Sequence, residues 1–326
     1  MPLRAFRGGL HPADRKAQTS ARAIERAPVP PRLTVPLSQH LGAPCSSVVA
    51  RDDRVRRGQL IGDTDAMIGA PVHAPVDGVV AAIEPVLLAS GARSTAVVIV
   101  PDERQEFDRW EPLALVGGST SDAVRSAGIV GLGGAAFPTT VKLATPHDVR
   151  IKTVIVNGCE CEPYLTCDHR IMLEEPRRVV RGATLLGKAV GAERVVIAVE
   201  DNKPDAALAL IAHAGDAVEV LSVPTRYPQG AERQLIWSVL GVEVPHGKLP
   251  SAVGALVNNV ATAAAVSWAV DDRKPLIERV VTVAGNVRAP GNYLTLLGTP
   301  VSALIEAAGG ISGPFRRIIA GGPMTG

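Results

Sequence analysis

The residues with the clearest chemical potential follow one apolar stretch of the sequence. Residues 149–156 read as a buried strand, and the carboxylates of Glu160 and Glu162 come directly after it. Ligands of α/β sheets bind beyond the carboxyl ends of the strands, so polar groups at this position are well placed for recognition. A carboxylate there can accept a hydrogen bond from a ribose hydroxyl, a carboxamide or the edge of an isoalloxazine ring. We therefore expect binding chemistry at this strand end.

A glycine-rich loop, Gly131-Leu132-Gly133-Gly134, precedes this strand. Glycines let backbone N–H groups approach a phosphate closely, and the start of a following helix favours its charge. Lys142, a short way downstream, could add a cation to the same phosphate. The loop is neither a Walker A motif nor a dinucleotide-binding fingerprint, because no Gly-Lys-Ser/Thr follows it and no clear strand directly precedes it. Taken alone, it is interpreted equally well as a tight turn.

Three of the four cysteines, Cys159, Cys161 and Cys167, lie within nine residues. Their Cys-x-Cys-x5-Cys spacing does not match the usual zinc or iron–sulfur frameworks, so small buried thiols are favoured and no metal site is predicted. Such crowding is typical of a reducing compartment. His40 and His73 could be metal ligands, but isolated histidines in turn-rich strands are more often structural.

Two further stretches carry polar groups near expected element ends. Residues 227–232 lie at a strand-to-helix turn and include Tyr227, Gly230 and Glu232. Residues 258–262 lie at a helix start, where asparagine and threonine can cap the helix and present amides. Each stretch is unremarkable alone, and together with the strand end they form a candidate site.

The elements that must position these groups alternate along the central region, residues 118–272. Strand patterns at 195–200 and 217–223 are separated by helix-like stretches at 176–190, 204–214 and 230–240. Strands spaced by helices of this length indicate an α/β layer with a parallel sheet.

The flanking regions have a different texture. Residues 1–35 read as a basic, extended arm, and residues 36–105 as a small all-β module. This module is similar to lipoyl- and biotinyl-type barrel-sandwich domains, but residues 63–67, in the position of their modified hairpin, contain no lysine. We therefore interpret it as a scaffold or docking surface. Residues 275–326 form a small α+β unit.

Composition excludes several classes of protein. The 326 residues suit two or three domains, and a net charge of +2 with 3% aromatic residues argues against nucleic-acid binding. Residues 1–57 nevertheless hold eleven Lys/Arg against four Asp/Glu, which could dock the protein onto an anionic partner. The N-terminus lacks a signal peptide's apolar core, and residues 253–270 are too polar to span a membrane. We expect a soluble or peripheral protein.

The motifs GIVGLGGAAFPTTVK, VNGCECEPYLTCDHRIMLE, VEDNKPDA, YPQGAERQLI and VNNVATA occur in this order. The chain thereby resembles the C subunit of the Rnf (Rsx) electron-transport complex, which is a membrane-bound, ion-translocating oxidoreductase working between ferredoxin and NAD. The central region is also similar to the NADH- and FMN-binding flavoprotein subunit of respiratory complex I. The resemblance implies a Rossmann-like flavin/NAD domain in the centre and a β-grasp domain of the soluble-ligand-binding type over residues 275–326.

The resemblance also implies site residues. Those expected to bind FMN are Gly131, Gly133, Gly134, Lys142, Asn157, Glu160, Tyr227, Gly230, Asn258, Asn259 and Thr262. Those expected to face NAD are Phe137, Glu162 and Glu232.

The sequence departs from the family pattern in three places. Ala136 stands where the related loop commonly has another glycine, and Leu132 stands where the complex I loop has a basic residue. The family continues into a ferredoxin-like domain whose eight cysteines hold two [4Fe–4S] clusters, whereas no cysteine follows Cys167 here. We therefore expect a C-terminally truncated member with an incomplete β-grasp domain and no cluster ligands.

The expected function is that of a peripheral subunit on the cytoplasmic face of the bacterial inner membrane. It would act as an NAD(H)-linked oxidoreductase within the complex, carrying electrons between NAD(H) and the other Rnf subunits through FMN. Two alternatives stay open: a truncated, non-catalytic scaffold of the same complex, and an independent soluble NADH dehydrogenase.

Overall fold

The computed structural model describes residues 6–88, 90–115, 117–145 and 149–326. Its described residues form two compact units. The first, here called the α/β unit, comprises residues 6–23, 142–267 and 321–326, and the second, the β-rich unit, comprises residues 24–141 and 268–320.

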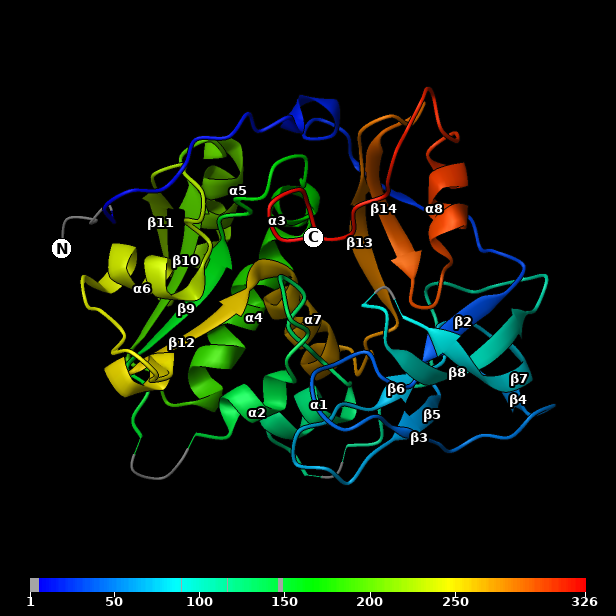
Figure 1. The fold of residues 1–326 in the computed structure, drawn as a ribbon. Coiled ribbons are helices and arrows are strands. Elements are labelled where there is room, and N and C mark those ends of the chain that lie inside the picture. The colour runs from blue at the N-terminus through cyan, green and yellow to red at the C-terminus, as the bar shows by residue number, and fades with distance from the viewer. Residues whose placement is uncertain (1–5, 89, 116, 146–148) are drawn as a thin grey trace. The chain divides into compact units, whose positions relative to one another are not determined.

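The α/β unit is built on a four-stranded parallel sheet with the order β11-β10-β9-β12. The strands are β9 (Thr153–Gly158), β10 (Arg194–Glu200), β11 (Glu219–Val223) and β12 (Ala255–Asn259). The chain runs outward from β9 to β11 and then returns to β12 on the other side of β9 (Figure 1). The strand order therefore reverses between β9 and β12, which is where parallel sheets bind their ligands.

Helices cover both faces of this sheet. They are α3 (Cys167–Glu174), α4 (Pro176–Ala189), α5 (Pro204–Ala214), α6 (Glu232–Leu240) and α7 (Val260–Asp271). Leu235 and Ile236 of α6 pack in one core with Ile155 of β9, whereas α4 lies against β9 and β10 from the other face. Gly182 of α4 approaches α7 so closely that an added Cβ would lie 1.7 Å from the carbonyl oxygen of Ala263. The predicted parallel α/β sheet is thus confirmed.

The N-terminal part of the β-rich unit holds two small antiparallel sheets, with orders β2-β8-β7-β4 and β3-β5-β6. Their strands are β2 (Leu33–Pro36), β3 (Ser46–Ser47), β4 (Arg54–Val55), β5 (Leu60–Asp63), β6 (Val72–His73), β7 (Gly78–Leu87) and β8 (Arg93–Pro101). Alternate side chains such as Leu33, Val35, Val97 and Ile99 form one apolar core. Met67, in the connection that lacks a lysine, is 87% exposed. The expected all-β module is confirmed.

A third sheet of the β-rich unit has the order β1-β14-β13. It is formed by β1 (Ile24–Arg26), β13 (Glu278–Val283) and β14 (Gly291–Leu296), and α8 (Val301–Ala307) follows. The same unit contains the short helix α1 (Thr120–Ser126), which begins with a capping box between Ser119 and Asp122. Helix α2 (Thr139–Leu143) spans the boundary between the two units.

The N-terminal segment differs from a free basic arm. Lys16–Gln18 form a short 3₁₀ helix, η1, in the α/β unit, whereas β1 and β2 pair within sheets of the β-rich unit. Two of its basic side chains are also paired internally, since Lys16 lies 3.8 Å from Glu160 and Arg26 lies 3.1 Å from Glu278. Residues 6–35 therefore belong to the two units and do not form the extended arm that was expected over residues 1–35, because backbone pairing and buried hydrogen bonds hold this segment.

None of the helices in the described part of the chain has the length and apolar character needed to cross a membrane. The stretch 253–270, the most apolar window of the sequence, divides between the 3₁₀ helix η2 (Pro250–Val253), β12 and α7.

Candidate nucleotide site

The carboxyl edge of the parallel sheet is organised by Asn157, the residue before the last one of β9. Its Nδ2 donates to the carbonyl oxygen of Gly230 at 2.8 Å, and its Oδ1 accepts from the backbone N–H of Cys159 at 3.0 Å. Asn157 therefore ties the turn after β11 to the end of β9. Asn157 is one of the residues expected to bind FMN. Its side-chain hydrogen bonds help to position the connections that carry other expected site residues.

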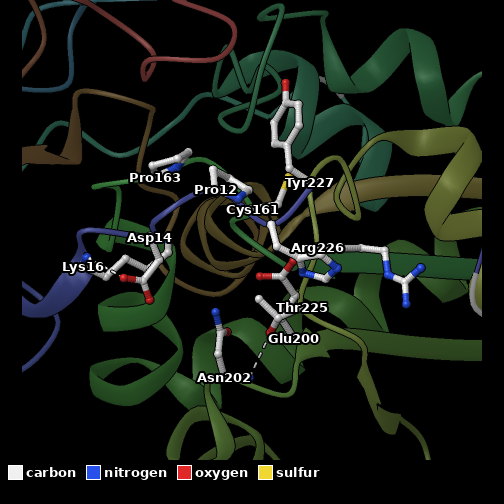
Figure 2. Close-up of a pocket in the computed structure, with 11 residues that line it drawn as sticks. Pro12, Asp14, Lys16, Cys161, Pro163, Glu200, Asn202, Thr225, Arg226 and Tyr227 are labelled. Carbon is white, nitrogen blue, oxygen red and sulfur yellow. Dashed lines mark hydrogen bonds between the residues drawn. The ribbon is translucent and has the colours of Figure 1, made fainter. Parts of the chain in front are cut away.

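Gly230 allows the turn and the strand end to come together. A Cβ added there would lie 3.3 Å from Sγ of Cys161 and 3.4 Å from Cβ of Cys159. The preceding Tyr227 forms an antiparallel bridge with Leu10, and its ring extends away from Glu200 and Asn202 (Figure 2). The turn thus presents backbone and an aromatic ring at the sheet edge.

Asn259, at the end of β12, acts on two elements. Its Oδ1 accepts from the N–H groups of Ala261 at 2.8 Å and Thr262 at 3.3 Å, so it caps α7 as the sequence predicted. Its Nδ2 donates to Asp168 of α3 at 2.6 Å. In the register of the sheet Asn259 stands opposite Asn157. The two predicted asparagines therefore flank the point where the strand order reverses.

Asn258 differs from its neighbour in the surroundings of its side-chain nitrogen. The residue is 6% exposed, and among the described residues Nδ2 has no hydrogen-bond partner. A buried donor without an acceptor costs about 1–3 kcal/mol, so such groups are normally completed by water or by a ligand. Asn258 thus offers a buried donor at the end of β12.

The same feature recurs along the edge. Within the described part of the α/β unit, the buried side-chain atoms without a partner are Glu200 Oε1, Arg226 Nε, Gln229 Oε1 and Asn258 Nδ2. All four lie at or after the carboxyl ends of β10, β11 and β12. Unsatisfied polarity in this unit is therefore concentrated where a ligand of a parallel sheet would bind.

Lys142 and Glu232 meet near the same edge. Nζ of Lys142 lies 2.9 Å from the carbonyl oxygen of Val257 in β12 and 3.2 Å from Oε1 of Glu232 at the start of α6. An ammonium group has three donors, and these two contacts leave one for a further acceptor. The structure thus brings together a cation expected to meet the phosphate of FMN and a carboxylate expected to face NAD.

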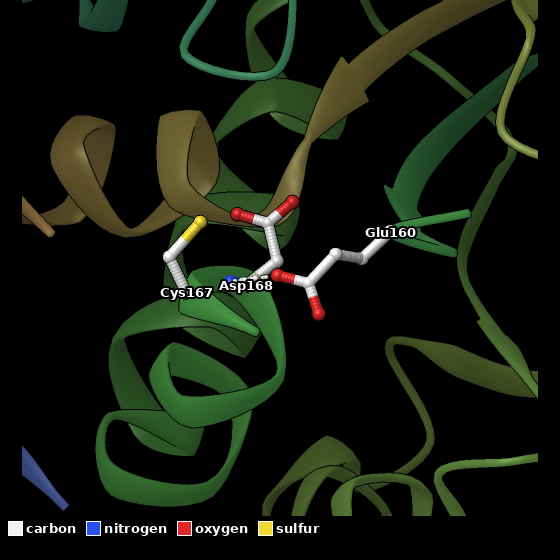
Figure 3. A group of neighbouring side chains, drawn as sticks. All are labelled: Glu160, Cys167 and Asp168. Atoms are coloured by element: carbon white, nitrogen blue, oxygen red, sulfur yellow. Dashed lines mark hydrogen bonds between the residues drawn. The ribbon is translucent and has the colours of Figure 1, made fainter. Parts of the chain in front are cut away.

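Glu160 is turned toward the protein. Its carboxylate accepts from the N–H groups of Asp168 at 2.6 Å and His169 at 3.4 Å, at the N-terminus of α3, and its side chain is 3% exposed. Figure 3 shows it beside Cys167 and Asp168, whose ligand atoms all lie within 4.8 Å of one another. Because Glu160 caps α3 and Asp168 binds Asn259, we interpret this group as a hydrogen-bonded helix terminus.

Glu162 is half-buried and faces the C-terminal segment. Its carboxylate accepts from the N–H of Met324 at 3.1 Å and from Oγ1 of Thr325 at 2.6 Å. Gly322 has a φ of +104°, and an added Cβ would lie 2.5 Å from Oε2 of Glu162. Residues 322–325 therefore fold around the carboxylate that was expected to face NAD.

The thiols of this edge are kept in their neutral form. Burial raises the pKa of Cys159 well above its usual value, and burial also raises the pKa of Cys161. Cys45, in the β-rich unit, has a pKa of about 11, mainly because it is buried. Neutral thiols are poor nucleophiles. Cys45 and Cys159 are buried, as expected of small packing groups, whereas Cys161 and Cys167 are only partly buried.

The glycine loop belongs to the β-rich unit, as does Phe137, whereas the other predicted site residues belong to the α/β unit. The bridge between Val130 and Pro138 and the 2.9 Å bond from Gly131 N to Phe137 O close the base of the loop. Gly133 and Gly134 are exposed, and a Cβ at Gly134 would meet nothing within 4 Å. The tip of the loop therefore leaves its backbone open.

Two buried cations at the edge were not anticipated from sequence. Nζ of Lys203 donates to Cys159 O at 2.7 Å and to Asn202 Oδ1 at 2.8 Å, and it lies 3.2 Å from Glu200, with both ionic side chains 1% exposed. Burial raises the pKa of Glu200 in spite of this lysine. Lys16 is the second cation. For Lys203, the signal available in the sequence was the Glu-x-x-Lys spacing directly after a predicted strand.

A cavity of about 70 Å³ lies between the N-terminal segment and the ends of β9 and β10 (Figure 2). Its polar lining includes Asp14, Lys16, Glu200, Asn202, Thr225 and Arg226. A cavity of this volume can hold a few ordered waters. It is too small for a nucleotide.

Three family models match the chain. The Nuo51 FMN-binding domain matches residues 124–268, the RnfC barrel sandwich hybrid domain matches residues 4–104, and the SLBB domain matches residues 280–326. The residues of the parallel sheet and its carboxyl edge thus fall within the match to an FMN-binding domain.

Curated relatives match over almost the whole chain. The C subunit of the proton-translocating ferredoxin:NAD(+) oxidoreductase complex of Clostridium ljungdahlii is 43% identical over 99% of this chain and 72% of its own length. The C subunit of the Na(+)-translocating complex of Acetobacterium woodii is 42% identical over 98% of this chain and 74% of its own length. The C subunit of the ion-translocating complex of Pseudomonas aeruginosa is 42% identical, with 99% of this chain and 43% of its own length covered. The chain is therefore similar to C subunits of complexes that are named for different ions.

Among solved structures, the NAD+-reducing [NiFe]-hydrogenase in its H2-reduced state is similar in fold. The TM-score is 0.53 with 24% sequence identity, over 60% of this chain and 39% of that chain. This likeness shows the fold alone.

Proposed function

Because this chain belongs to the family of C subunits of ion-translocating (Rnf-type) oxidoreductase complexes, we propose that it carries electrons between NAD(H) and such a complex through FMN. The site is the carboxyl edge of the parallel sheet, within the stretch that matches an FMN-binding domain. The observation that carries the proposal is that, within the described part of the α/β unit, the unpartnered buried side-chain atoms lie at this edge, next to the reversal of strand order.

The residues of this edge fit FMN. Nδ2 of Asn258 is a buried donor that lacks an acceptor among the described residues, and Lys142 has one donor left for a phosphate. The open tip of the glycine loop offers backbone N–H groups of the kind that bind phosphate. The residues proposed to hold FMN are Gly131, Gly133, Gly134, Lys142, Asn157, Glu160, Tyr227, Gly230, Asn258, Asn259 and Thr262.

These residues contribute in different ways. Asn157 and Asn259 shape the site by holding the turn at Gly230 and the start of α7. Glu160 contributes through the backbone that it anchors, since its carboxylate caps α3. Asn258 and Lys142 bind the group directly. FMN itself supplies the conversion of a two-electron hydride transfer from NADH into single-electron steps.

NAD(H) is proposed to bind beside this site, against Phe137, Glu162 and Glu232. The two carboxylates can accept hydrogen bonds from ribose hydroxyls. Glu162 accepts from Met324 and Thr325, so a dinucleotide that uses this carboxylate replaces those two bonds or shares the acceptor. Glu232, paired with Lys142, links the NAD and FMN parts of the site.

The partners proposed are the other subunits of an Rnf-type complex, with the chain peripheral on the cytoplasmic face of the inner membrane. The four cysteines are free thiols without the spacing of a cluster site, so onward transfer uses acceptors outside these 326 residues, such as the [4Fe–4S] clusters typical of the family. A Rossmann-like description of the central region and a β-grasp description of residues 275–326 belong to the same proposal.

Anaerobic addition of NADH to the FMN-loaded protein tests the proposal. We expect the flavin absorbance to be bleached, with transfer to ferricyanide, and Glu162→Gln to require more NADH at an almost unchanged melting temperature. Glu193→Gln, which changes an exposed carboxylate paired with Arg150, is the matched control. A folded protein that takes up no FMN would favour the scaffold alternative, and bound FMN that NADH does not bleach would contradict the electron-transfer role.

A further inference from the structure

The N-terminal segment of the α/β unit crosses the carboxyl edge of the sheet (Figure 1). We call residues 6–23 the strap. At one end, Leu10 bridges Tyr227, and the carbonyl oxygen of Phe6 accepts from Arg226 at 2.9 Å. At the other end, Oγ1 of Thr19 accepts from Thr166 at 2.8 Å, at the start of α3. The strap therefore contacts both connections that the proposed function assigns to nucleotide binding.

Between these ends, Lys16 enters the connection between β9 and α3, residues 159–166. Its Nζ donates to the carbonyl oxygens of Glu160 at 2.8 Å, Glu162 at 3.0 Å and Leu165 at 2.5 Å. The carbonyl oxygen of Asp14 accepts from the N–H of Tyr164 at 2.7 Å. All three donors of the ammonium group are thus directed at one short connection.

This connection needs an external partner to keep its shape. Glu160 and Tyr164 have positive φ values of 49° and 68°, in the left-handed region that non-glycine residues avoid. Each such residue costs energy unless its surroundings hold it in place. Three carbonyl groups of this strained backbone accept hydrogen bonds from the one ammonium group of Lys16. The carboxylate of Glu160, 3.8 Å from Nζ, balances its charge.

A lysine used in this way is costly to bury. Lys16 is 8% exposed, and burial lowers its pKa. Lysine rarely becomes this buried unless it is paired. The three carbonyl groups and Glu160 together provide that pairing, and arginine could not, because its planar guanidinium does not match three converging acceptors around one nitrogen.

We infer that Lys16 is a positioning residue of the nucleotide site, through which the strap sets the geometry of the connection that carries Glu160 and Glu162. The effect of Lys16 on nucleotide binding rests on the proposed function. Its effect on the shape of the connection rests on the hydrogen bonds alone. Removal of the ammonium frees three carbonyl groups and the left-handed turns, so Glu162 loses its fixed position relative to the sheet edge. Removal of the ammonium group is therefore expected to lower the affinity for the dinucleotide more than it lowers kcat.

Lys16→Met tests the inference, with Arg15→Met as the control that removes an adjacent exposed positive charge. Thr19→Val is the second control, because it loosens the strap at α3 without touching the carbonyl groups. Hydrogen exchange of the amides of residues 160–165 is measured without cofactor, and KM for NADH and kcat with ferricyanide are measured on the FMN-loaded protein. Lys16→Gln, which keeps two donors, replaces Lys16→Met if that variant does not fold.

We expect Lys16→Met to lose amide protection in residues 160–165 and to raise KM for NADH about tenfold, the factor that corresponds to one lost charge-assisted hydrogen bond. kcat should change less than KM, and both controls should keep the KM of the unmodified chain. Unchanged protection in Lys16→Met or Lys16→Gln would overturn the structural part. The positioning role would be overturned if Lys16→Met lost protection but kept its KM for NADH. An equal rise of KM in Thr19→Val would also overturn it. If the unmodified chain shows no NADH activity, the proposed function fails while the exchange data still decide the role of Lys16 in the connection.

Discussion

The two units bury cations for different purposes. In the β-rich unit, Arg57 is 1% exposed and lies 2.8 Å from the carboxylate of Glu278, which also meets Lys274 at 2.6 Å. Burial alone would raise the pKa of Glu278, but Lys274 and Arg57 outweigh it and hold that pKa at about 2. In the α/β unit, Lys16 meets mainly backbone carbonyl groups. One arrangement is a buried ion network, and the other holds a loop in shape.

The two units also differ in where their buried polar groups lie. The network of Arg57 and Glu278 joins two segments 221 residues apart in sequence, and therefore serves the fold. The polar atoms at the carboxyl edge of the α/β unit include several without a partner among its described residues. The described part of the β-rich unit also has unpartnered buried atoms, including Arg57 Nε and His73 Nδ1. Those of the α/β unit differ in position, because they lie at the carboxyl ends of parallel strands, where ligands bind.

Removal of Arg57 should have the largest effect. Arg57→Met leaves the buried carboxylate of Glu278 without its most buried partner, so we expect the free energy of unfolding to fall by about 3–5 kcal/mol. Urea unfolding measures this change. Arg32→Met, which breaks an exposed pair with Glu84, should cost less than about 1 kcal/mol. Similar losses in the two variants would remove the distinction between a buried network and a surface pair.

The β-rich unit should also respond to acid through His73 of β6. Burial lowers the pKa of His73 to about 4 from its ordinary value of 6.5. Between these values the unfolded chain binds a proton that the folded chain does not, so the free energy of unfolding falls as pH falls from 6.5 to 4. A difference of about 2.5 units corresponds to roughly 3 kcal/mol at most. His73→Leu should flatten this part of the stability profile, and the exposed His213→Gln should not. A profile that stays equally steep in His73→Leu would contradict the burial of a neutral histidine.

At the carboxyl edge of the parallel sheet, removal of a cation should affect FMN binding. Lys142→Ala removes the donor proposed for the phosphate of FMN and should weaken FMN binding by about 1–3 kcal/mol. The free energy of unfolding should change little, because Lys142 is partly exposed. Lys188→Ala, which removes an exposed lysine at the end of α4, is the control. Equal FMN affinity in both variants, measured by titration of the apoprotein, would take Lys142 out of the site.

The smallest effect is expected in the glycine loop. Ala136 has a φ of 51°, which glycine adopts without strain. Ala136→Gly should therefore raise the free energy of unfolding by no more than about 1 kcal/mol. Ala135→Gly, at a neighbour without a positive φ, should lower it or leave it unchanged. Thermal unfolding of the two variants compares them, and a loss of stability in Ala136→Gly would show that the methyl group has a packing role.

Much of this edge follows from local patterns in the sequence. Asn157 was expected there because it follows an apolar strand, and strands of a parallel sheet place their ends at one edge. Asn259 was expected at a helix start, and the strand β12 that it ends was not predicted. The capping of α7 by Asn259 follows from side-chain chemistry near a helix start. Lys142 and Glu232 were expected in the candidate site from separate motifs, the family resemblance assigned them to FMN and NAD, and the structure pairs them across 90 residues.

What escaped the sequence depends on distant contacts. The bonds of Lys16 reach residues 144 to 149 positions away, and composition alone made this lysine part of a basic arm. Glu160 was expected to line the FMN site, yet its left-handed backbone turns the carboxylate toward α3. A backbone angle of this kind leaves no periodic signal, so the direction of a side chain after a strand end cannot be read from residue type.

The claim that the carboxyl edge is held open for FMN is tested most directly at Asn258. Leucine is of comparable size and has no donor, so Asn258→Leu should raise the free energy of unfolding of the apoprotein by about 1–2 kcal/mol while it weakens FMN binding. Changes in opposite directions, measured by urea unfolding and FMN titration on the same preparations, are what this account predicts. A loss of apoprotein stability together with unchanged FMN affinity would show that the amide serves the fold, and would contradict the account.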